Sequence, residues 1–275
     1  MFDRFSRSWS LVQASAAVLR SDKELMVFPL ISGALTLVVL ATFLLPIWML
    51  RVFDGGFNVL GAVLVFAFYF CQYSVILFCN CALVGAAMIR LDGGDPTLSD
   101  GFNAARARLP AILGYAAIAA TVGLVLKRMK DDDSLLVRLL GSGLGAAWTL
   151  ATFLVVPVLV SQNVGPIDAL KHSASLLKRT WGENAIGNVG IGMFFGLVSF
   201  SIILVGALLA YLVAQVSVAL AIAVAVVFVV AVLLVGVYQA ALSGIYSAAL
   251  YRYATNGEAP AAFQGLQLQH AFQAK

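Results

Sequence analysis

The side chains with the strongest chemistry in this sequence are three cysteines and two histidines, and their spacing is poor for catalysis or metal binding. Cys71, Cys79 and Cys81 share one apolar stretch. Residues two apart on a helix point to nearly opposite sides, so Cys79 and Cys81 can form neither a disulfide nor a shared metal site within that helix. We predict that the three thiols are small core side chains.

The histidines and the acidic segment at residues 90–101 are also weak candidates for metal sites. His172 follows Asp168 by four residues on the polar face of a predicted helix, which favours a solvated ion pair over a haem or zinc ligand. The acidic segment, RLDGGDPTLSDG, lacks the spacing and the terminal glutamate of an EF-hand loop. No phosphate loop, nucleophile elbow or dinucleotide motif occurs in a suitable setting. We therefore predict no metal, no cofactor and no enzymatic activity.

Uncharged polar residues inside the apolar runs are the remaining candidates for a ligand path. Ionisable groups at membrane depth are costly and tend to mark function, yet none of the six proposed spans contains Asp, Glu, Lys, Arg or His. This argues against a proton relay, a paired-aspartate intramembrane protease and a buried metal. A solute path would have to use amide side chains, which interhelical hydrogen bonds explain equally well: Gln72, Asn80, Asn188 and Gln239.

The composition around these residues is that of a membrane protein. Of 275 residues, 62% are hydrophobic and 11% are charged, whereas a soluble domain has roughly 25% charged residues. Uncharged runs cover residues 25–50, 57–89, 111–126, 139–161 and 184–251. Because a span needs about 20 apolar residues, the last run must turn back, and we place the turn near Gln215 and Ser217. The sequence predicts an all-α membrane protein with six transmembrane helices.

The distribution of cations sets the expected orientation. With six spans both termini share one face, and that face carries twelve Lys and Arg residues against five on the other. We predict an inner-membrane protein with both termini in the cytoplasm, the orientation that the positive-inside rule gives. The formal charge of +4 fits anionic headgroups better than nucleic acid. We expect membrane lipids as partners, with a larger membrane protein complex as a second option.

A repeated unit, an amphipathic helix followed by two spans, organises the chain. Apolar residues at offsets 0, 3, 7, 10 and 14 form a helical stripe at Ile167, Leu170, Ala174, Leu177 and Trp181, and again at Phe2, Phe5, Trp9, Val12 and Ala16. A third copy begins near Asp95, where Thr97 and Asp100 resemble a capping box. The predicted units are 2–90, 95–162 and 167–253, inside one membrane domain at 1–254 that precedes a polar cytoplasmic tail at 255–275.

The amphipathic helices have a basic polar face opposite Trp, Phe or Leu, a pattern typical of helices that lie in the membrane interface. We therefore predict three in-plane helices, here called elbow helices, at the cytoplasmic boundary. Whether they touch lipid or only pack on the spans stays open. Their candidate lipid or partner contacts are Arg4, Arg7, Trp9, Arg106, Arg108, Lys171, Lys178, Arg179 and Trp181.

Small residues and one proline indicate how the spans pack. Three small-residue repeats allow close helix approach and indicate a tight bundle or a subunit contact: Gly141 with Gly145, Gly192 with Gly196, and Ala240, Gly244 and Ala248. Pro157 predicts a kink in the fourth span, and broken helices do occur at transport sites.

Three stretches resemble a domain-of-unknown-function family of bacterial polytopic integral membrane proteins. They are RFSRSWSLVQASAAVLRSDKELMVFPL at 4–30, RLDGGDPTLSDGFNAARARLPAILGYA at 90–116 and ATFLVVPVLVSQNVGPIDALKHSASLLKRTWGENAIGNVG at 151–190. The resemblance implies a bacterial membrane but no activity, and Ser161 and Gln162 stand where an acidic residue is expected. More loosely, the helix-plus-hairpin pattern is similar to the membrane domain of glycerophosphodiester phosphodiesterases and to cysteine-pathway sulfate permeases, a likeness of architecture alone.

These patterns together predict a non-enzymatic accessory or bilayer-organising protein whose elbow helices contact lipid headgroups or a partner complex. The alternative is a passive transporter or channel for a small solute. A transporter needs a continuous polar cavity at mid-bilayer, whereas an accessory protein has none and docks an apolar face elsewhere.

Overall fold

The computed structural model of this chain describes residues 2–49, 59–131 and 133–256, with side chains described at 12–46, 59–131, 133–176 and 190–255. All regular structure in these residues is helical, which confirms the predicted class. The elements are α1 (Phe2–Ser21), the 3₁₀ helix η1 (Lys23–Met26), α2 (Val27–Met49), α3 (Val59–Leu91), α4 (Leu98–Ala107), α5 (Leu109–Lys130), α6 (Leu135–Thr152), α7 (Val155–Ser161), α8 (Pro166–Ala214) and α9 (Val218–Asn256).

Six helical segments are long and apolar enough to cross a membrane, as predicted. They are Lys23–Pro46, Val59–Leu91, Leu109–Lys130, Leu135–Ser161, Gly190–Ala214 and Val218–Thr255. The turn between the last two spans falls at residues 215–217, as the polar residues Gln215 and Ser217 predicted. The chain is therefore a multi-pass membrane protein.

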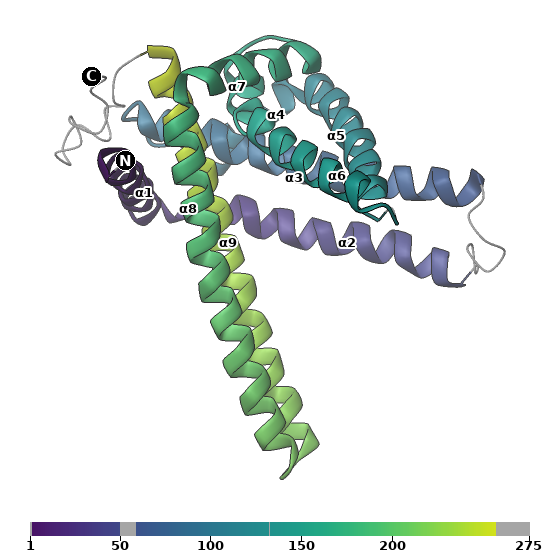
Figure 1. The fold of residues 1–275 in the computed structure, drawn as a ribbon. Helices are drawn as coiled ribbons and strands as arrows, with labels where there is room; N and C mark the ends of the chain where they lie inside the picture. Colours follow the sequence, from purple (N-terminus) through teal and green to yellow (C-terminus); the bar gives the residue numbers. More distant parts are fainter. Residues whose placement is uncertain (1, 50–58, 132, 257–275) are drawn as a thin grey trace.

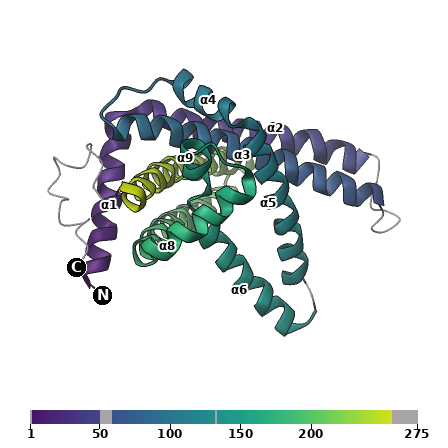
Figure 2. The same ribbon diagram turned by 90° about the horizontal axis from the view of Figure 1, so that it is seen from above.

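The spans form three helical hairpins, α2–α3, α5–α6 and α8–α9, that radiate from a shared base (Figures 1 and 2). The base contains α1, α4, α7 and the adjoining ends of the hairpins. The α8–α9 hairpin extends from it as a long stalk, and the α2–α3 hairpin runs off in a different direction (Figure 1). In the most apolar 18-residue stretch of α9, no residue is buried. Within the described part of the chain, the hairpins do not close into the tight bundle that the small residues suggested.

The hydrophobic core occupies the base. Phe28 at the start of α2 meets Phe102 of α4 edge to face, with ring centroids 5.2 Å apart. Tyr246, near the end of α9, is fully buried in the same core. Side chains from the first, second and last thirds of the sequence thus close one core, and its largest fully buried members include Leu19, Leu25, Leu83, Leu91, Ile112, Leu154 and Leu242.

Two of the three small-residue repeats are used in helix packing. A Cβ at Gly244 would lie 2.4 Å from Leu83 Cδ2, and one at Gly141 would lie 2.8 Å from Met129 Cβ. The close approach of α9 to α3, and of α6 to α5, therefore requires glycine at these two positions. The third repeat, Gly192 with Gly196, faces no atom within 4 Å, so its predicted packing role is not seen among the described residues.

The first two predicted elbow helices are separate helices, α1 and α4. The capping box at the start of α4 is confirmed: Asp100 N donates to Thr97 Oγ1 at 3.3 Å, and Thr97 N donates to Asp100 Oδ2 at 2.9 Å. The hydroxyl and N–H of Thr97 hold the pKa of the Asp100 carboxyl below its usual value. Asp100 therefore stays ionised at the positive end of the helix dipole, which favours the helical first turn.

The third predicted elbow helix is continuous with the fifth span and is not an element of its own. Residues 166–214 form one helix, α8, which bends so that its first turns cross the top of the molecule before the rest descends beside α9 (Figure 1). The amphipathic stripe ends near Trp181, but no proline follows it inside the helix. Because backbone groups that enter a membrane need internal hydrogen bonds, a continuous helix is favoured over a break there.

The in-plane position of the elbow helices and the duplication of the three units stay predictions. The predicted starts of the three units fall at or next to the beginnings of α1, α4 and α8. The part of the predicted tail after residue 256 lies outside the described residues.

Candidate functional site

The fourth span is broken between α6 and α7, beside Pro157, where the sequence predicted a kink. Proline has no N–H and its ring displaces the carbonyl four residues earlier, here that of Phe153. Ser173 of α8 fills the break: its hydroxyl donates to Ala151 O at 2.6 Å and accepts from Leu154 N at 3.2 Å. Because Ser173 takes up these backbone groups, the break does not offer them to an ion or solute.

A hydrogen-bonded chain joins the end of α7 to α8 and α9. Gln162 donates from Nε2 to the Tyr251 hydroxyl at 3.0 Å, and its Oε1 lies 2.7 Å from His172 Nδ1. An amide oxygen only accepts, so Nδ1 carries the proton in this contact. His172 thus makes a structural contact, and no group of three or more His, Cys, Asp or Glu that could hold a metal occurs among the described residues.

Ion pairs lie at the same base. Arg252, near the end of α9, pairs with Asp92 in the turn after α3. Arg90, in the last turn of α3, places Nη1 at 3.1 Å from Asp95 Oδ1. Both acidic partners are more than half exposed, and exposed ion pairs contribute only about 0–1 kcal/mol. These pairs therefore orient the turn more than they stabilise the fold.

Three of the predicted lipid or partner contacts have described side chains. Arg106 is exposed, and Lys171 is exposed with its Nζ 3.5 Å from Asp168 Oδ1. Arg108 is half-buried and donates from Nη1 to Asn163 Oδ1. Arg106 and Lys171 thus face outward, whereas Arg108 binds a loop of the protein itself. The other predicted contacts lie outside the described side chains: Arg4, Arg7, Trp9, Lys178, Arg179 and Trp181.

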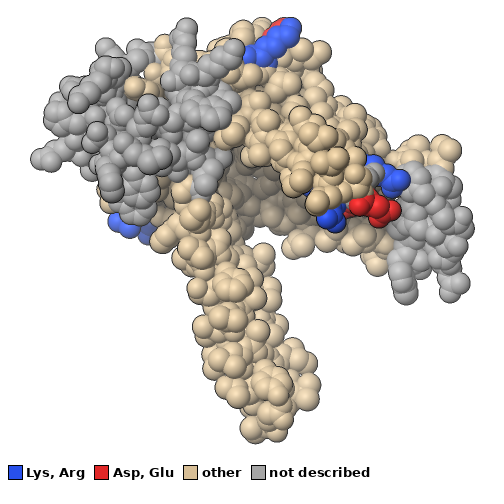
Figure 3. Space-filling model, viewed as in Figure 1, with Lys and Arg blue, Asp and Glu red and all other residues tan. Residues whose placement is uncertain are grey.

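Charged side chains gather at the ends of the hairpins. In Figure 3 Lys and Arg lie at the base and at the far end of α5–α6, and the α8–α9 stalk shows no charge on the visible face. At the far end of α5, Lys127 Nζ lies 5.9 Å from the ring centroid of Tyr69. The α5–α6 hairpin thus has an apolar zone between two charged ends, whereas the α8–α9 stalk is charged only where it joins the base.

The predicted solute-path residues with described side chains line neither of the two pockets described in this structure. Gln72 and Asn80 lie on α3 and Gln239 lies on α9, all half-buried, and the side chain of Asn188 is outside the described part. Gln72 Oε1 is buried and has no hydrogen-bond partner among the described residues. The two described pockets, one in the stalk and one at the base, are lined by other residues.

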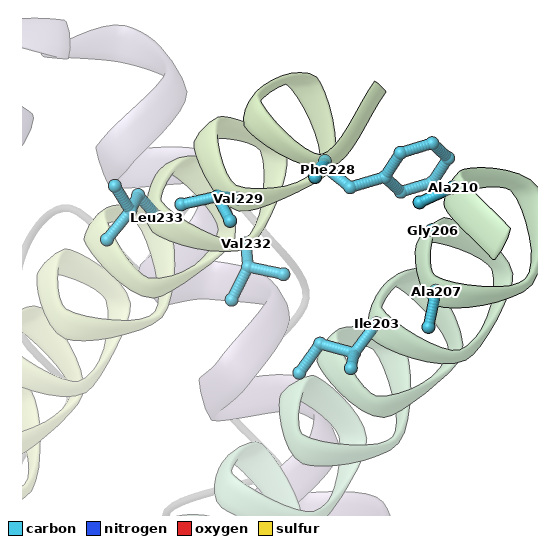
Figure 4. A pocket seen from close by; sticks show the side chains of 9 residues that line it. Ile203, Gly206, Ala207, Ala210, Phe228, Val229, Val232 and Leu233 are labelled. Carbon is cyan, nitrogen blue, oxygen red and sulfur yellow. The ribbon is translucent and has the colours of Figure 1, made fainter. Parts of the chain in front are cut away.

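The first of these pockets lies between α8 and α9 and is wholly apolar. Figure 4 shows Phe228 reaching from α9 towards Gly206 of α8, where a Cβ would lie 2.5 Å from Phe228 Cγ. The cavity volume is about 340 Å³, and the lining is Ile203, Gly206, Ala207, Ala210, Ala225, Phe228, Val229, Val232 and Leu233. Solute sites carry a few convergent polar groups that fix orientation, so this lining suits an acyl chain better than a polar solute.

Sequence reasoning missed Ser173, Gln162 and Tyr251 as the polar residues that hold the base together. Ser173 is next to Ala174 of the apolar stripe, and Gln162 directly follows the fourth span. A polar residue beside a stripe is a signal for burial. It does not identify the partner, which lies 19 residues away for Ser173 and 89 for Gln162.

A family model described as a family of unknown function, DUF6159, matches residues 59–261, which is most of the chain. The chain belongs to the DUF6159 family. The expected membership of a domain-of-unknown-function family is thus confirmed. The DUF6159 match includes α3 to α9 and most of the base, while α1 and α2 lie outside it. No curated protein matches the chain.

Proposed function

We propose that this DUF6159 protein is a non-enzymatic accessory or bilayer-organising component of a bacterial inner membrane, with both termini in the cytoplasm. Its base lies at the cytoplasmic headgroup boundary, where the elbow helices contact anionic lipids or a partner complex. The observation that carries this proposal is the separation of surfaces. The filled core and most charged pairs gather at the base, while the spans beyond it expose apolar side chains.

Lipids are the partner that satisfies both surfaces. Phe200 and Leu204 of the stalk are 62% and 60% exposed, and each Å² of such apolar surface costs about 25 cal/mol in water. Acyl chains remove that cost. Arg106 and Lys171 at the base are exposed cations, and each basic residue near an anionic leaflet contributes about 1 kcal/mol of binding.

The polar groups of the base support a non-enzymatic role. The hydroxyl of Ser173 binds two backbone groups of the broken span. His172, Gln162 and Tyr251 bind one another. A catalytic site needs a nucleophile or base directed at a reacting atom in a pocket, whereas these side chains are directed at other parts of the protein.

One observation favours the alternative, a passive transporter or channel. Gln72 Oε1 is a buried acceptor on a membrane span without a partner among the described residues, and leaving such a group unpaired costs about 1–3 kcal/mol. A solute donor would relieve that cost. If Gln72→Leu abolishes flux of a polar solute into proteoliposomes, the result supports the transporter. If the substitution only raises the free energy of unfolding, Gln72 is a packing residue.

The headgroup proposal is tested by removing two cations from the base. We expect the double variant Arg106→Gln, Lys171→Gln to lose preference for spin-labelled phosphatidylglycerol over phosphatidylcholine by about twofold to tenfold, because each cation contributes up to about 1 kcal/mol at an anionic surface. Electron paramagnetic resonance of the full chain in mixed vesicles measures this preference. The effect must shrink at high salt, since exposed charges are screened.

The control removes the same charge from the other end of the molecule. Arg128→Gln with Arg138→Gln alters two exposed cations near Asp131 and Asp133, and these acids already offset the local field. We expect a smaller loss of phosphatidylglycerol preference. Equal losses in the two double variants would contradict a special role for the base.

A further inference from the structure

A second pocket lies at the base, between the last turn of α1 and the turn after α3. Its cavity volume is about 410 Å³, and it is lined by Ala17, Val18, Ser21, Arg90, Gly93 and Gly94. The first candidate span begins at Lys23 and the second ends at Leu91. The pocket therefore opens where two spans leave the apolar zone, which is headgroup depth in a bilayer.

The turn after α3 keeps the pocket open. Gly93 has a φ of 86°, in the left-handed region. The N–H groups of Gly93 and Gly94 donate to Arg90 O and Ile89 O, each at 3.0 Å, the pair of bonds that ends a helix in a Schellman motif. A Cβ at Gly93 would meet no atom within 4 Å, so the backbone there borders open space.

Arg90 keeps donors for a ligand. Its Nη1 donates to Gly94 O at 3.2 Å and to Asp95 Oδ1 at 3.1 Å, whereas its Nε and Nη2 bind no described residue. A guanidinium presents five N–H donors in a fixed fork, which matches two oxygens of a phosphate. The Asp95 side chain is 97% exposed, so it competes weakly for Arg90.

The charge balance favours an anion with a single negative charge. Both α1 and α3 end here, and each helix C-terminus disfavours an anion by about twofold to fivefold, so the two together disfavour it by about fourfold to twenty-fivefold. A bidentate guanidinium–phosphate pair outweighs this, because each of its two charge-assisted hydrogen bonds favours binding by about tenfold or more. Asp22, buried directly after Ser21, adds repulsion that a dianionic monoester feels more than a phosphodiester.

We propose that this pocket binds the phosphodiester of an anionic phospholipid. Arg90 holds two phosphate oxygens with Nε and Nη2, and the glycerol lies against Ala17 and Val18. The Ser21 hydroxyl donates to Val18 O at 2.8 Å in this structure and exchanges that bond for one to the phosphate. The choice of a lipid as the source rests on the proposed headgroup contact of the base. A headgroup bound here links the end of α1 to the end of α3.

The test counts phosphatidylglycerol molecules that remain bound to the full chain. The protein is placed in phosphatidylcholine nanodiscs that contain a small fraction of phosphatidylglycerol, released into the mass spectrometer under native conditions, and compared with its variants. We expect Arg90→Gln to lower retention of one phosphatidylglycerol by about tenfold, and Arg90→Lys to recover part of it because a point charge lacks the fork.

Asp95→Asn separates a binding role from a structural one. This substitution removes the competitor of Arg90 and leaves Arg90 in place, so we expect it to raise retention, opposite in sign to Arg90→Gln. A purely structural ion pair would make both variants change in the same direction. Such a result, or unchanged retention in Arg90→Gln with normal elution and melting temperature, overturns the site.

Two further arms identify the source of the phosphate and separate this inference from the proposed function. Inorganic phosphate and soluble glycerophosphoglycerol should not displace the lipid, and full displacement by either assigns the pocket to a soluble ligand. The variant Arg106→Gln, Lys171→Gln should keep the bound lipid. Loss in that variant alone removes the pocket inference, whereas loss in Arg90→Gln alone supports it. The general role of the base is judged separately, by the phosphatidylglycerol preference of the double variant in mixed vesicles.

Discussion

At the scale of single residues, one hydroxyl keeps the broken fourth span inside the fold. Ser173 is fully buried and bonds both sides of the break between α6 and α7. A freed N–H or C=O in an apolar setting costs far more than a hydrogen bond gains in water. The side chain therefore acts as a local substitute for the helical partners that Ala151 O and Leu154 N lack at the break.

Replacing this hydroxyl should destabilise the protein. We expect Ser173→Ala to lower the free energy of unfolding by about 1–3 kcal/mol, because Leu154 N and Ala151 O lose their partner while still buried. Chemical unfolding in detergent micelles measures the change. The matched control is Ser175→Ala two residues on, where the exposed hydroxyl donates to His172 O at 2.8 Å and its loss is expected to be nearly neutral. Equal effects of the two substitutions would count against the role of Ser173.

Residue contacts were predictable from sequence only where both partners are local. Thr97 and Asp100 are three residues apart, and a capping box has a recognisable spacing. Gln162 and Tyr251 are 89 residues apart, and no local pattern connects them. The same holds for the pocket residues Ser21 and Arg90, which come from different helices. The exposed cations Arg106 and Lys171 could be predicted because a basic helix face shows in the sequence.

At the scale of helices, composition carried most of the information. Uncharged runs predicted the six spans, and the polar residues at 215–217 predicted the last turn, as the structure confirms. The continuation of α8 through the predicted elbow was not predictable, because an amphipathic stripe specifies a face and contains no stop signal. The small-residue repeats predicted close packing without a partner, so Gly244 could be identified but its neighbour Leu83 could not.

The contact between α9 and α3 gives a sharp test at this scale. We expect Gly244→Ala to destabilise the protein by about 1–3 kcal/mol, because the new Cβ would overlap the buried Leu83 side chain. Gly236→Ala on the same helix is the control. Its Cβ would meet no atom within 4 Å, so it should be neutral or stabilise α9 by up to about 1 kcal/mol through helix propensity.

Thermal unfolding of both variants in one detergent measures the difference. The comparison cancels the effect of replacing glycine with alanine in the helix itself. A Gly244→Ala variant as stable as Gly236→Ala would show that Leu83 can move aside, and that the close approach of α9 to α3 is not required.

At the scale of the whole molecule, the directions of the hairpins raise a geometric requirement. The α2–α3 and α8–α9 hairpins leave the base in different directions (Figures 1 and 2). A flat hydrocarbon layer is only about 30 Å thick, and each hairpin is longer than that. For all six spans to cross one flat bilayer, the hairpins must swing towards one another. We expect the stalk to bend at three glycines where an added Cβ would meet no atom within 4 Å, Gly192 and Gly196 on α8 and Gly236 on α9.

This swing predicts a change of distance between hairpins. Spin labels at Leu40→Cys on α2 and Leu208→Cys on α8, both exposed positions, should lie closer in nanodiscs than in detergent, because only the bilayer forces the hairpins to align. Pulsed electron resonance measures the distance in a Cys71→Ser background, since Cys79 and Cys81 are buried. A control pair within the stalk, Leu208→Cys with Val226→Cys, should not change. An unchanged hairpin-to-hairpin distance would mean that one hairpin does not span the membrane.

The radiating arrangement was not predictable from the sequence for a physical reason. Periodicity specifies which face of a helix is apolar, but in these spans nearly every face is apolar, as the three consecutive exposed residues Ile203, Leu204 and Val205 illustrate. Lipid and protein then compete for the same surfaces on similar terms. Only the base, where charged and apolar faces alternate, carries a pattern that specifies its own packing.

The core of the base can close only after the last helix has been synthesised. Tyr246 and Leu250, near the end of α9, close it against Leu19 and Leu25 from the beginning of the chain. During synthesis the first two hairpins are finished long before these residues leave the ribosome. A chain that stops early therefore exposes the apolar surface of the unfinished base to membrane proteases. Synthesis of the final helix is the step that covers this surface.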